Sequence, residues 1–398
     1  MAKRIILLII LLVIGDIYFY QAVSTLTVVP GMAFLYWAID LGLIFALSSI
    51  ALVPAFRARA KDYLPWLISA LMLSLIPKLL ASPILLGEDI VRLLTGFAYR
   101  NIYVSEAALL IAVGTFLIMI FGLTRGKYHY KVRRETLYFP NLPTAFDGFT
   151  ITQLSDIHSG SLKNKRRVQQ GVDLANAQES DLILFTGDLV NNTAEEMKPW
   201  SSTFGELRAS YGKYSVLGNH DYGDYVRWES QQAKSYNLQQ LEEVHHEIGF
   251  QLLRNRSMNI HKGNASISLV GVENWGKGGF QQYGDLNRAT ENVDKAAFKI
   301  LMSHDPSHWT EQVIDHPQDV QLTLSGHTHG MQFGLDLPFL RWSPIQYFYK
   351  QWAGLYQQDG KYLYVNRGFG FHGLQGRIGI WPEITVLTLK KAKVSTSV

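Results

Sequence analysis

Four apolar stretches before residue 125 constrain this chain more than any other feature of its sequence. They cover about residues 5–26, 32–53, 64–86 and 107–123. Each is close to the roughly 20 residues that a helix needs to cross a hydrocarbon core about 30 Å thick. Because these stretches are almost free of charge, only 18% of all 398 residues are charged. The sequence therefore predicts a transmembrane region over residues 1–125 and a separate soluble part after it.

Two of the stretches admit another interpretation. Lys3-Arg4 precedes the first stretch as in a signal peptide, but the apolar core is long and no small-residue cleavage site follows. Pro77-Lys78 interrupts the third stretch, which could instead be re-entrant or lie in the membrane interface. If the third stretch spans, Lys78 either snorkels or marks a kink. We expect both stretches to be spanning helices.

The charges between the stretches predict the topology. Arg57, Arg59 and Lys61 form one basic cluster, and a second one lies within residues 125–134. The positive-inside rule places both clusters in the cytoplasm, so an even number of crossings must separate them. We therefore expect a multi-pass protein of the cell inner (plasma) membrane, with four helices and a cytoplasmic C-terminal part. The alternative places that part outside the cell.

Two carboxylates, Asp16 and Asp40, lie inside the first two apolar stretches. Ionisable groups within a bilayer are by default candidates for a functional site, but either group could simply form a hydrogen bond within the helix bundle. No neighbouring pattern resembles a transport pathway. We favour the structural role, and the sequence leaves the functional one open.

The soluble part begins after a basic linker. Residues 126–147 carry several Lys and Arg residues, and Pro140 and Pro143 break regular structure there. Residues 148–392 then form one domain, and residues 393–398 form a tail. In this domain strand-like apolar runs are separated by helical patterns, such as residues 163–177 and 194–209, which predicts an α/β fold.

Five of the strand-like runs end in residues that commonly bind metals. The groups that follow them are Ser155-Asp156-Ile157-His158, Gly187-Asp188, Gly218-Asn219-His220-Asp221, Ser303-His304-Asp305 and Gly326-His327-Thr328-His329. Any one group could be a turn or a helix cap. In α/β folds, however, ligands gather outside the carboxyl ends of strands, so we expect all five groups to converge. Imidazole and carboxylate ligands suit borderline and harder divalent metals, and the absence of cysteine excludes thiolate ligands.

This ordered set of motifs resembles that of the calcineurin-like metallophosphoesterase superfamily. Ser-Asp-x-His and Gly-His-Thr-His-Gly fit best the membrane-anchored bacterial branch of predicted phosphohydrolases. The resemblance covers roughly residues 148–390. It implies a four-layer α/β/β/α sandwich, here preceded by four transmembrane helices, and a site for two divalent metal ions. Mn, Fe, Zn and Co all remain candidates, because ligand type alone does not choose among them.

The resemblance also implies a role for each motif residue. The implied ligands are Asp156, His158 and His329 for one metal, Asn219, His304 and His327 for the other, and Asp188 as a bridge between them. His220 would face the leaving group as a general acid or hydrogen-bond donor, and Asp221 would orient it. A hydroxide shared by the two metals would attack phosphorus.

Residues outside the motifs are harder to assign. Arg367 is the best candidate for a phosphate contact, and His308 could approach the site from the start of a helix. We expect the remaining histidines at the surface: His129, His245, His246, His261, His316 and His372. Residues 337–356 are rich in aromatic side chains, which suits a lipid-binding edge beside the site or the packing of a long insertion.

The function predicted from these features is that of a membrane-anchored phosphohydrolase that cleaves a phosphoester or pyrophosphate bond. Because tethering concentrates membrane substrates, we favour a lipid-linked substrate over a soluble nucleotide or a phosphoprotein, although kinship of fold does not settle a substrate. A catalytically idle membrane sensor or scaffold is the non-enzyme alternative, and the complete ligand set argues against it. No nucleic-acid partner is expected, because the net charge of +4 is mild and no basic arm is present.

Overall fold

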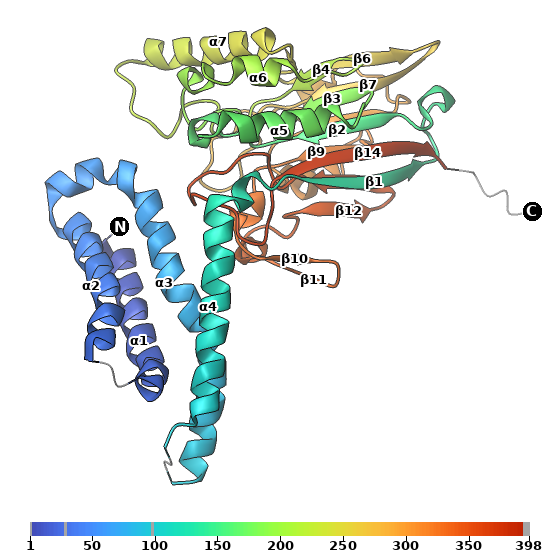
Figure 1. Ribbon diagram of the computed structural model, residues 1–398. Helices are drawn as coiled ribbons and strands as arrows, with labels where there is room; N and C mark the ends of the chain where they lie inside the picture. The colour runs from blue at the N-terminus through green and yellow to red at the C-terminus, as the bar shows by residue number, and fades with distance from the viewer. Residues whose placement is uncertain (1, 28–29, 97–98, 393–398) are drawn as a thin grey trace, which may run out of the picture. The chain divides into compact units, whose positions relative to one another are not determined.

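The computed structural model describes residues 2–27, 30–96 and 99–392 (Figure 1). The predicted tail, residues 393–398, lies outside this range. The chain divides into two compact units. Unit 1 contains the chain up to Arg125 together with Gly373–Ile378, and unit 2 contains the rest. Each unit is described by itself.

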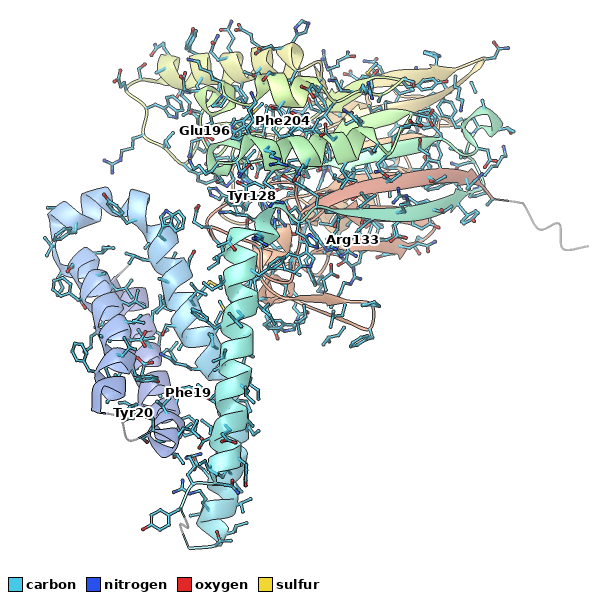
Figure 2. The ribbon with its side chains drawn as sticks, in the orientation of Figure 1. Phe19, Tyr20, Tyr128, Arg133, Glu196 and Phe204 are labelled. Carbon is cyan, nitrogen blue, oxygen red and sulfur yellow. The ribbon has the colours of Figure 1, made fainter. Side chains whose placement is uncertain are left out.

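Unit 1 contains four helices that are long and apolar enough to cross a membrane. They are α1 (Ala2–Leu26), α2 (Pro30–Leu52), α3 (Pro54–Leu94) and α4 (Ile102–Thr124). Many of their apolar side chains are exposed, such as Phe34 at 77% and Phe45 at 75%, as lipid-facing side chains must be, whereas Phe19, labelled in Figure 2, is buried. The prediction of four helices is confirmed.

The third helix is longer than the predicted stretch of residues 64–86. It runs for 41 residues without a break and includes Pro65, Pro77 and Pro83. Prolines are tolerated within transmembrane helices because neighbouring groups satisfy the freed backbone. The re-entrant alternative for this stretch is therefore wrong, and the hydropathy pattern missed only the polar turns at the two ends of the helix.

One buried ion network joins α1, α2 and α3. The ammonium group of Lys78 pairs with the carboxylates of Asp16 and Asp40, at 2.6 Å from Asp40 Oδ2, and donates to Ser74 Oγ at 2.9 Å. Asp16 and Asp40 are both buried. Lys78 therefore neither snorkels nor interrupts its helix. The single ammonium is shared by the two carboxylates and joins three helices, which supports the structural role favoured for Asp16 and Asp40.

Unit 2 contains two six-stranded sheets and a separate hairpin. The first sheet has the order β1 (Lys131–Phe139), β14 (Glu383–Lys391), β2 (Thr150–Leu154), β3 (Leu182–Phe185), β4 (Lys213–Ser215) and β5 (Gln251–Leu252). The second has the order β12 (Gly354–Gln358), β13 (Lys361–Val365), β9 (Leu322–Ser325), β8 (Lys299–Met302), β7 (Ala265–Gly271) and β6 (Arg256–Lys262). The hairpin pairs β10 (Leu335–Leu337) with β11 (Leu340–Trp342). Strands β2 to β5 are parallel to one another, as are β13, β9, β8 and β7.

The segment predicted to be a linker, residues 126–147, contains strand β1. This strand pairs in parallel with β14, from Lys131 opposite Glu383 to Phe139 opposite Lys391. Its charged residues hide the strand pattern in the sequence, since only Leu137 and Phe139 are fully buried. The partner strand lies near the other end of the domain, so a local pattern could not reveal the pairing.

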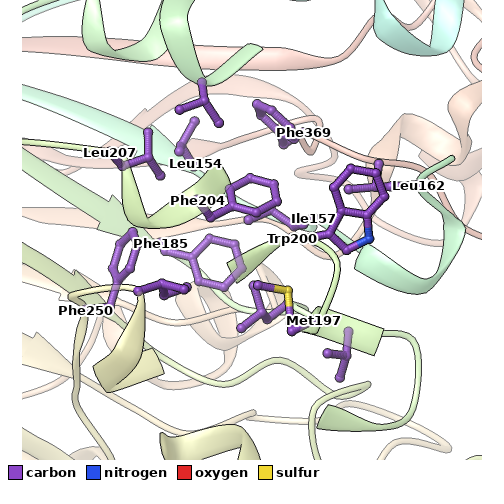
Figure 3. Close-up of a cluster of buried hydrophobic side chains, with 14 of the residues drawn as sticks. Leu154, Ile157, Leu162, Phe185, Met197, Trp200, Phe204, Leu207, Phe250 and Phe369 are labelled. Carbon is purple, nitrogen blue, oxygen red and sulfur yellow. The ribbon is translucent and has the colours of Figure 1, made fainter. Parts of the chain in front are cut away.

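Three apolar clusters hold four layers together. Between the sheets, Ile151 and Leu184 of the first pack with Leu269, Ile300 and Leu324 of the second. Helices α5 (Lys165–Asn176), α6 (Ser201–Gly205) and α7 (Gln231–Glu247) lie together on one side of the first sheet (Figure 1). Figure 3 shows the cluster beneath them. Helix α8 (Leu286–Thr290) and the π-helical turn η5 (Trp309–Val313) cover the second sheet.

The predicted α/β/β/α sandwich is therefore confirmed. The helix expected over residues 194–209 is instead two short pieces, the 3₁₀ turn η4 (Ala194–Met197) and α6. Phe204 of α6 and Trp200 before it are buried against Phe185 of β3 (Figure 3). Packing against the sheet, rather than a long amphipathic face, therefore fixes this segment.

Candidate metal centre

Five loops bring the predicted ligands to one place. The loops follow β2, β3 and β4 of the first sheet and β8 and β9 of the second, and in each sheet these strands are parallel neighbours. Hydrogen bonds join the loops directly. The N–H of Asp156 donates to the carbonyl of Gly187 at 2.9 Å, and the N–H of Gly326 donates to the carbonyl of His304 at 3.0 Å. The strand order of the two sheets therefore creates the site.

The backbone of these loops is unusual. Five of the seven predicted ligands have a left-handed backbone, with φ between 48° and 71°: Asp156, His158, Asp188, His327 and His329. Residues other than glycine adopt this conformation rarely, and it concentrates at functional sites. Two glycines leave room for the carboxylates, because a Cβ atom on Gly218 would lie 2.2 Å from Asp188 Oδ1 and one on Gly326 would lie 2.2 Å from Asp156 Oδ2.

The first ligand group consists of Asp156, His158 and His329, whose ligand atoms lie within 4.8 Å of one another. Nε2 of His329 lies 3.0 Å from Nε2 of His158 and 3.2 Å from Oδ1 of Asp156. Burial lowers the pKa of His158 well below its ordinary value, so this ring is neutral and has a lone pair to offer. Burial would raise the pKa of Asp156, but the nearby His329 and His304 hold it below its usual range. Neutral imidazole and an ionised carboxylate suit a borderline divalent cation.

The second group consists of Asp188, His304 and His327, with Asn219 beside them. Asn219 Oδ1 lies 2.8 Å from His327 Nδ1, and Asp188 Oδ2 lies 3.2 Å from His304 Nε2. His304 Nε2 is buried, and the Asp188 carboxylate is the polar group that it faces. A buried imidazole nitrogen directed at a carboxylate fits a metal ligand.

His304 carries a proton when no cation is bound. Burial lowers its pKa, but the Asp188 carboxylate outweighs this and raises the pKa of His304 to about 10. The imidazolium thereby compensates the charge of Asp188, whose own pKa is held below its usual range. A metal would have to displace this proton.

Asp188 lies between the two groups. Its Oδ2 is 3.2 Å from His304 Nε2 and 3.5 Å from His158 Nε2. Its Oδ1 accepts a hydrogen bond from the N–H of His220 at 2.8 Å. One carboxylate oxygen thus borders both ligand groups, which is the position that a bridging ligand requires.

The second nitrogen of three of the rings is fixed from outside the site. His304 Nδ1–H donates to the carbonyl of Thr186 at 2.7 Å, and His158 Nδ1 lies 3.1 Å from Asn191 Oδ1. His327 Nε2 lies 2.9 Å from the hydroxyl of Tyr349. Such outer contacts set the tautomer and orientation of metal-binding histidines. Tyr349 belongs to the aromatic segment 337–356, so this segment borders the site.

His220 and Asp221 do not interact as predicted. The Nδ1–H of His220 donates to the carbonyl of Asn191 at 2.8 Å, and this contact orients the ring. The carboxylate of Asp221 instead accepts hydrogen bonds from four backbone N–H groups, those of Asp188, Leu189, Val190 and Gly218. The predicted role of Asp221 is therefore wrong. It holds the loops after β3 and β4 together, because its side chain turns back toward their backbone.

Neither candidate for a substrate contact has that role in the structure. Arg367 is 1% exposed, and its guanidinium pairs with Glu383 at 2.6 Å and with Asp336 at 3.1 Å. His308 is fully buried, with its ring nitrogens 2.8 Å from Ser303 Oγ and 2.9 Å from Gln312 Oε1. Both predictions are wrong because these polar groups are already bound to partners inside unit 2.

Three histidines expected at the surface are buried or lie in the site. His245 and His316 are buried. The ring of His372 stacks on His158 with centroids 4.7 Å apart and lies 4.4 Å from the ring of His220. Its loop also contacts the first ligand loop, since a Cβ atom on Gly370 would lie 1.8 Å from the carbonyl oxygen of Ile157. The glycines that precede His372 were the one sequence signal for such a close approach.

The fold and the site define a class: an α/β/β/α sandwich with two adjoining groups of His, Asp and Asn ligands, attached to four membrane helices. Sequence comparison identifies the family. Residues 149–331 match the calcineurin-like phosphoesterase family, and residues 3–127 match a family described as the probable transmembrane domain of a calcineurin-like phosphoesterase. The chain therefore belongs to the calcineurin-like metallophosphoesterase family, in its transmembrane form.

Two similar proteins are also described as metallophosphoesterases or as carrying such a domain. The uncharacterized metallophosphoesterase YkuE of Bacillus subtilis is 32% identical over 65% of this chain and 85% of its own length. A transmembrane protein with a metallophosphoesterase domain from Bos taurus is 30% identical to this chain. The matched region covers 72% of this chain and 62% of that relative. Among solved structures, the sulfate thiohydrolase SoxB of Thermus thermophilus matches 63% of this chain and 57% of its own, with 12% identity and a TM-score of 0.36.

Proposed function

We propose that this protein is a dinuclear-metal phosphohydrolase that cleaves a phosphoester or pyrophosphate bond of a lipid-linked substrate. The observation that carries the proposal is the position of Asp188, whose Oδ2 borders both ligand groups at 3.2 and 3.5 Å. Asp156, His158 and His329 would hold one cation, and Asn219, His304 and His327 the other. When bound, two such cations stabilise the charge of phosphoryl oxygens and supply a hydroxide nucleophile at neutral pH.

The charge of the ligand set favours an anionic substrate. Two carboxylates, Asp156 and Asp188, face the proposed cations, and the other ligands would be neutral imidazoles and an amide once a metal has displaced the proton of His304. Two divalent cations with two carboxylates leave a net positive charge of about two, which attracts a phosphate group.

His220 is oriented so that it could donate a proton to the leaving group. Because its Nδ1–H donates to a backbone carbonyl, Nε2 is the nitrogen that can carry a second proton. Its ring lies 5.0 Å from the ring of His158 and 4.6 Å from that of Tyr225. Protonated at Nε2, His220 would donate to the oxygen of the leaving group. Asn191 is then the residue that orients it.

The four membrane helices support a substrate that resides in the bilayer. A tethered site meets membrane substrates at a high local concentration, and a soluble nucleotide or phosphoprotein gains nothing from this. The orientation that we propose has unit 2 in the cytoplasm, on the basis of the basic clusters beside the helices. A reporter fused after Val398 tests this orientation.

The hydrolase proposal is tested on the full-length protein in lipid nanodiscs. Metal content and hydrolysis of bis-p-nitrophenyl phosphate and of phospholipid and lipid-pyrophosphate substrates are compared between wild type, Asp188→Asn and His220→Ala. His261→Ala, at an exposed position on β6, is the matched control. We expect two metals per chain in wild type, loss of metal in Asp188→Asn, and retained metal with slow turnover in His220→Ala. If the two-metal protein cleaves none of these compounds, the proposal fails.

A further inference from the structure

Most of the exposed large apolar side chains of unit 2 lie in one segment of the chain. Across residues 126–392, ten large hydrophobic side chains are exposed, and seven of them fall between residues 331 and 348. The seven are Met331, Leu335, Leu337, Phe339, Leu340, Tyr347 and Phe348, with exposures from 44% to 85%. Scattered exposed hydrophobic residues are normal, but such a concentration marks an interaction site. We call these seven residues the apolar patch.

The apolar patch lies on a hairpin that is fixed at its base. Strands β10 and β11 pair with each other and with neither large sheet (Figure 1), and Phe339, 85% exposed, follows β10 at the turn. An isolated two-stranded hairpin is marginally stable. Here Asp336 of β10 pairs with Arg133 and with Arg367, whose Nε lies 3.1 Å from Asp336 Oδ2. Ion pairs with Arg133 and the buried Arg367 thus fix the hairpin to the domain while apolar residues occupy its tip.

Both ends of the patch adjoin the metal centre. Met331 follows the ligand His329 by two residues, and Ser343 Oγ–H, just after β11, donates to the carbonyl of Gly330 at 2.7 Å. Tyr349, next to the exposed Phe348, contacts the ligand His327 at 2.9 Å. Whatever covers the apolar patch therefore lies beside the proposed reaction site.

The composition of the segment fits a lipid surface. Aromatic and aliphatic side chains combine with the exposed cations Arg341 and Lys350, and this combination is typical of segments that enter the interfacial layer of anionic membranes. The chain itself also brings a bilayer within reach. Only residues 125–130 lie between α4 and β1, and this connection spans at most about 25 Å when fully extended.

We propose that the apolar patch is a membrane-contacting surface that enters the interfacial layer of an anionic bilayer next to the metal centre. The contact itself does not depend on the reaction. Its consequence, delivery of a lipid-linked phosphoester to the site, rests on the proposed function. A soluble protein partner or a second copy of the chain would bury the same side chains, and the test separates these cases.

The absence of cysteine makes the contact directly measurable. Phe339→Cys is labelled with an environment-sensitive fluorophore in the full-length protein, reconstituted in vesicles of phosphatidylcholine and phosphatidylglycerol. Tyr236→Cys on α7, an aromatic position with 62% exposure, is the matched control. Lipids with a quencher on the acyl chain should quench the label at 339 and leave the label at 236 bright. If the label at 339 is not quenched, the proposal is overturned. It is also overturned if the label is protected from water only at a high ratio of protein to lipid, because a second copy of the chain would then cover the patch.

A double variant tests the consequence for the reaction. Phe339→Asp with Phe348→Asp should slow hydrolysis of a vesicle-embedded phosphoester by about tenfold or more, because two apolar anchors are lost. Hydrolysis of soluble bis-p-nitrophenyl phosphate should be unchanged. Equal loss on both substrates would show that the patch supports the site rather than the membrane contact. If wild type cleaves neither substrate, the proposed function fails, and the quenching result still decides the contact.

Discussion

Replacing Asp221 with asparagine separates the role found in the structure from the one that the sequence suggested. The Asp221 carboxylate accepts four backbone hydrogen bonds, two on each oxygen. Asparagine has the same shape but replaces one oxygen with an NH₂ group, which is a donor. Two backbone N–H groups would then face another donor inside a buried loop pair. If the NH₂ group replaces Oδ2, the loops that carry Asp188 and Asn219 lose the oxygen that joins them. If it replaces Oδ1, the loop after β3 loses both bonds from Leu189 and Val190.

The size of the effect follows from these contacts. On one oxygen the donors lie at 2.8 and 2.8 Å, and on the other at 2.8 and 3.2 Å, so either choice loses two charge-assisted hydrogen bonds. Burial and the neighbouring Asp188 carboxylate raise the pKa of Asp221 to about 7, so the comparison is made above that pH, where Asp221 is ionised. There each bond contributes about 1.5–3 kcal/mol, so the free energy of unfolding should fall by about 3–6 kcal/mol. In a domain of this size that corresponds to a fall in melting temperature of roughly 6–24 °C.

Thermal unfolding of the full-length protein in detergent, followed by intrinsic fluorescence, and metal content per chain are the two measurements. Asp285→Asn is the matched control, because Asp285 caps α8 by accepting from the N–H of Arg288 and asparagine caps a helix equally well. We expect Asp221→Asn to melt earlier and to lose metal, and the control to behave like wild type. If Asp221→Asn kept its melting temperature and its metal but lost hydrolysis, Asp221 would act through His220 and our interpretation would be refuted.

Three further predictions concern the charges of unit 2. Arg367→Met removes the nearest cation of the buried Glu383 carboxylate, at 2.6 Å, and leaves Arg133, at 3.6 Å from Glu383, as the cation paired with both Glu383 and Asp336. The variant should therefore destabilise the protein by about 3 kcal/mol, measured by thermal unfolding, without raising KM. A raised KM at unchanged stability would return Arg367 to the substrate. Burial lowers the pKa of His245 to about 3, from an ordinary value of 6.5, so folding favours its neutral form. Its contribution to stability is complete above pH 6.5 and is lost as the pH falls toward 3, and His245→Gln should flatten this part of a stability–pH profile. A metal must displace the proton on His304, whose pKa is about 10, so metal affinity should rise with pH below that value. Calorimetry in buffers of different ionisation enthalpy should detect the proton release. A pH-independent affinity would show that His304 is not a ligand.

The features that the sequence predicted correctly are those recorded in local patterns. Hydropathy over about 20 residues is enough to identify a spanning helix, because the bilayer imposes that length. The candidate ligands were equally visible, since each group directly follows an apolar run and parallel strands place their carboxyl ends at one edge of a sheet. The order of five such groups also resembled one family, and the comparisons confirm that family.

The incorrect predictions share a physical cause. Whether Asp221 contacts His220 or four backbone amides depends on how two loops from different strands meet, and no spacing in the chain records this. The same holds for Arg367, whose buried partner Glu383 begins another strand, and for His372, which reaches His158 from far along the chain.

The sequence by itself therefore determined which residues form the membrane helices, which strand ends carry candidate ligands, and to which family the chain belongs. Only the tertiary structure decided that Lys78 pairs with both Asp16 and Asp40, that β1 joins the first sheet, and that Asp188 lies between two ligand groups. The spacing of apolar residues within one segment shows which face of that helix or strand is buried. The partner of a charged or polar side chain is set instead by contacts between distant segments, because the free energy of burying that group depends on the partner it finds there.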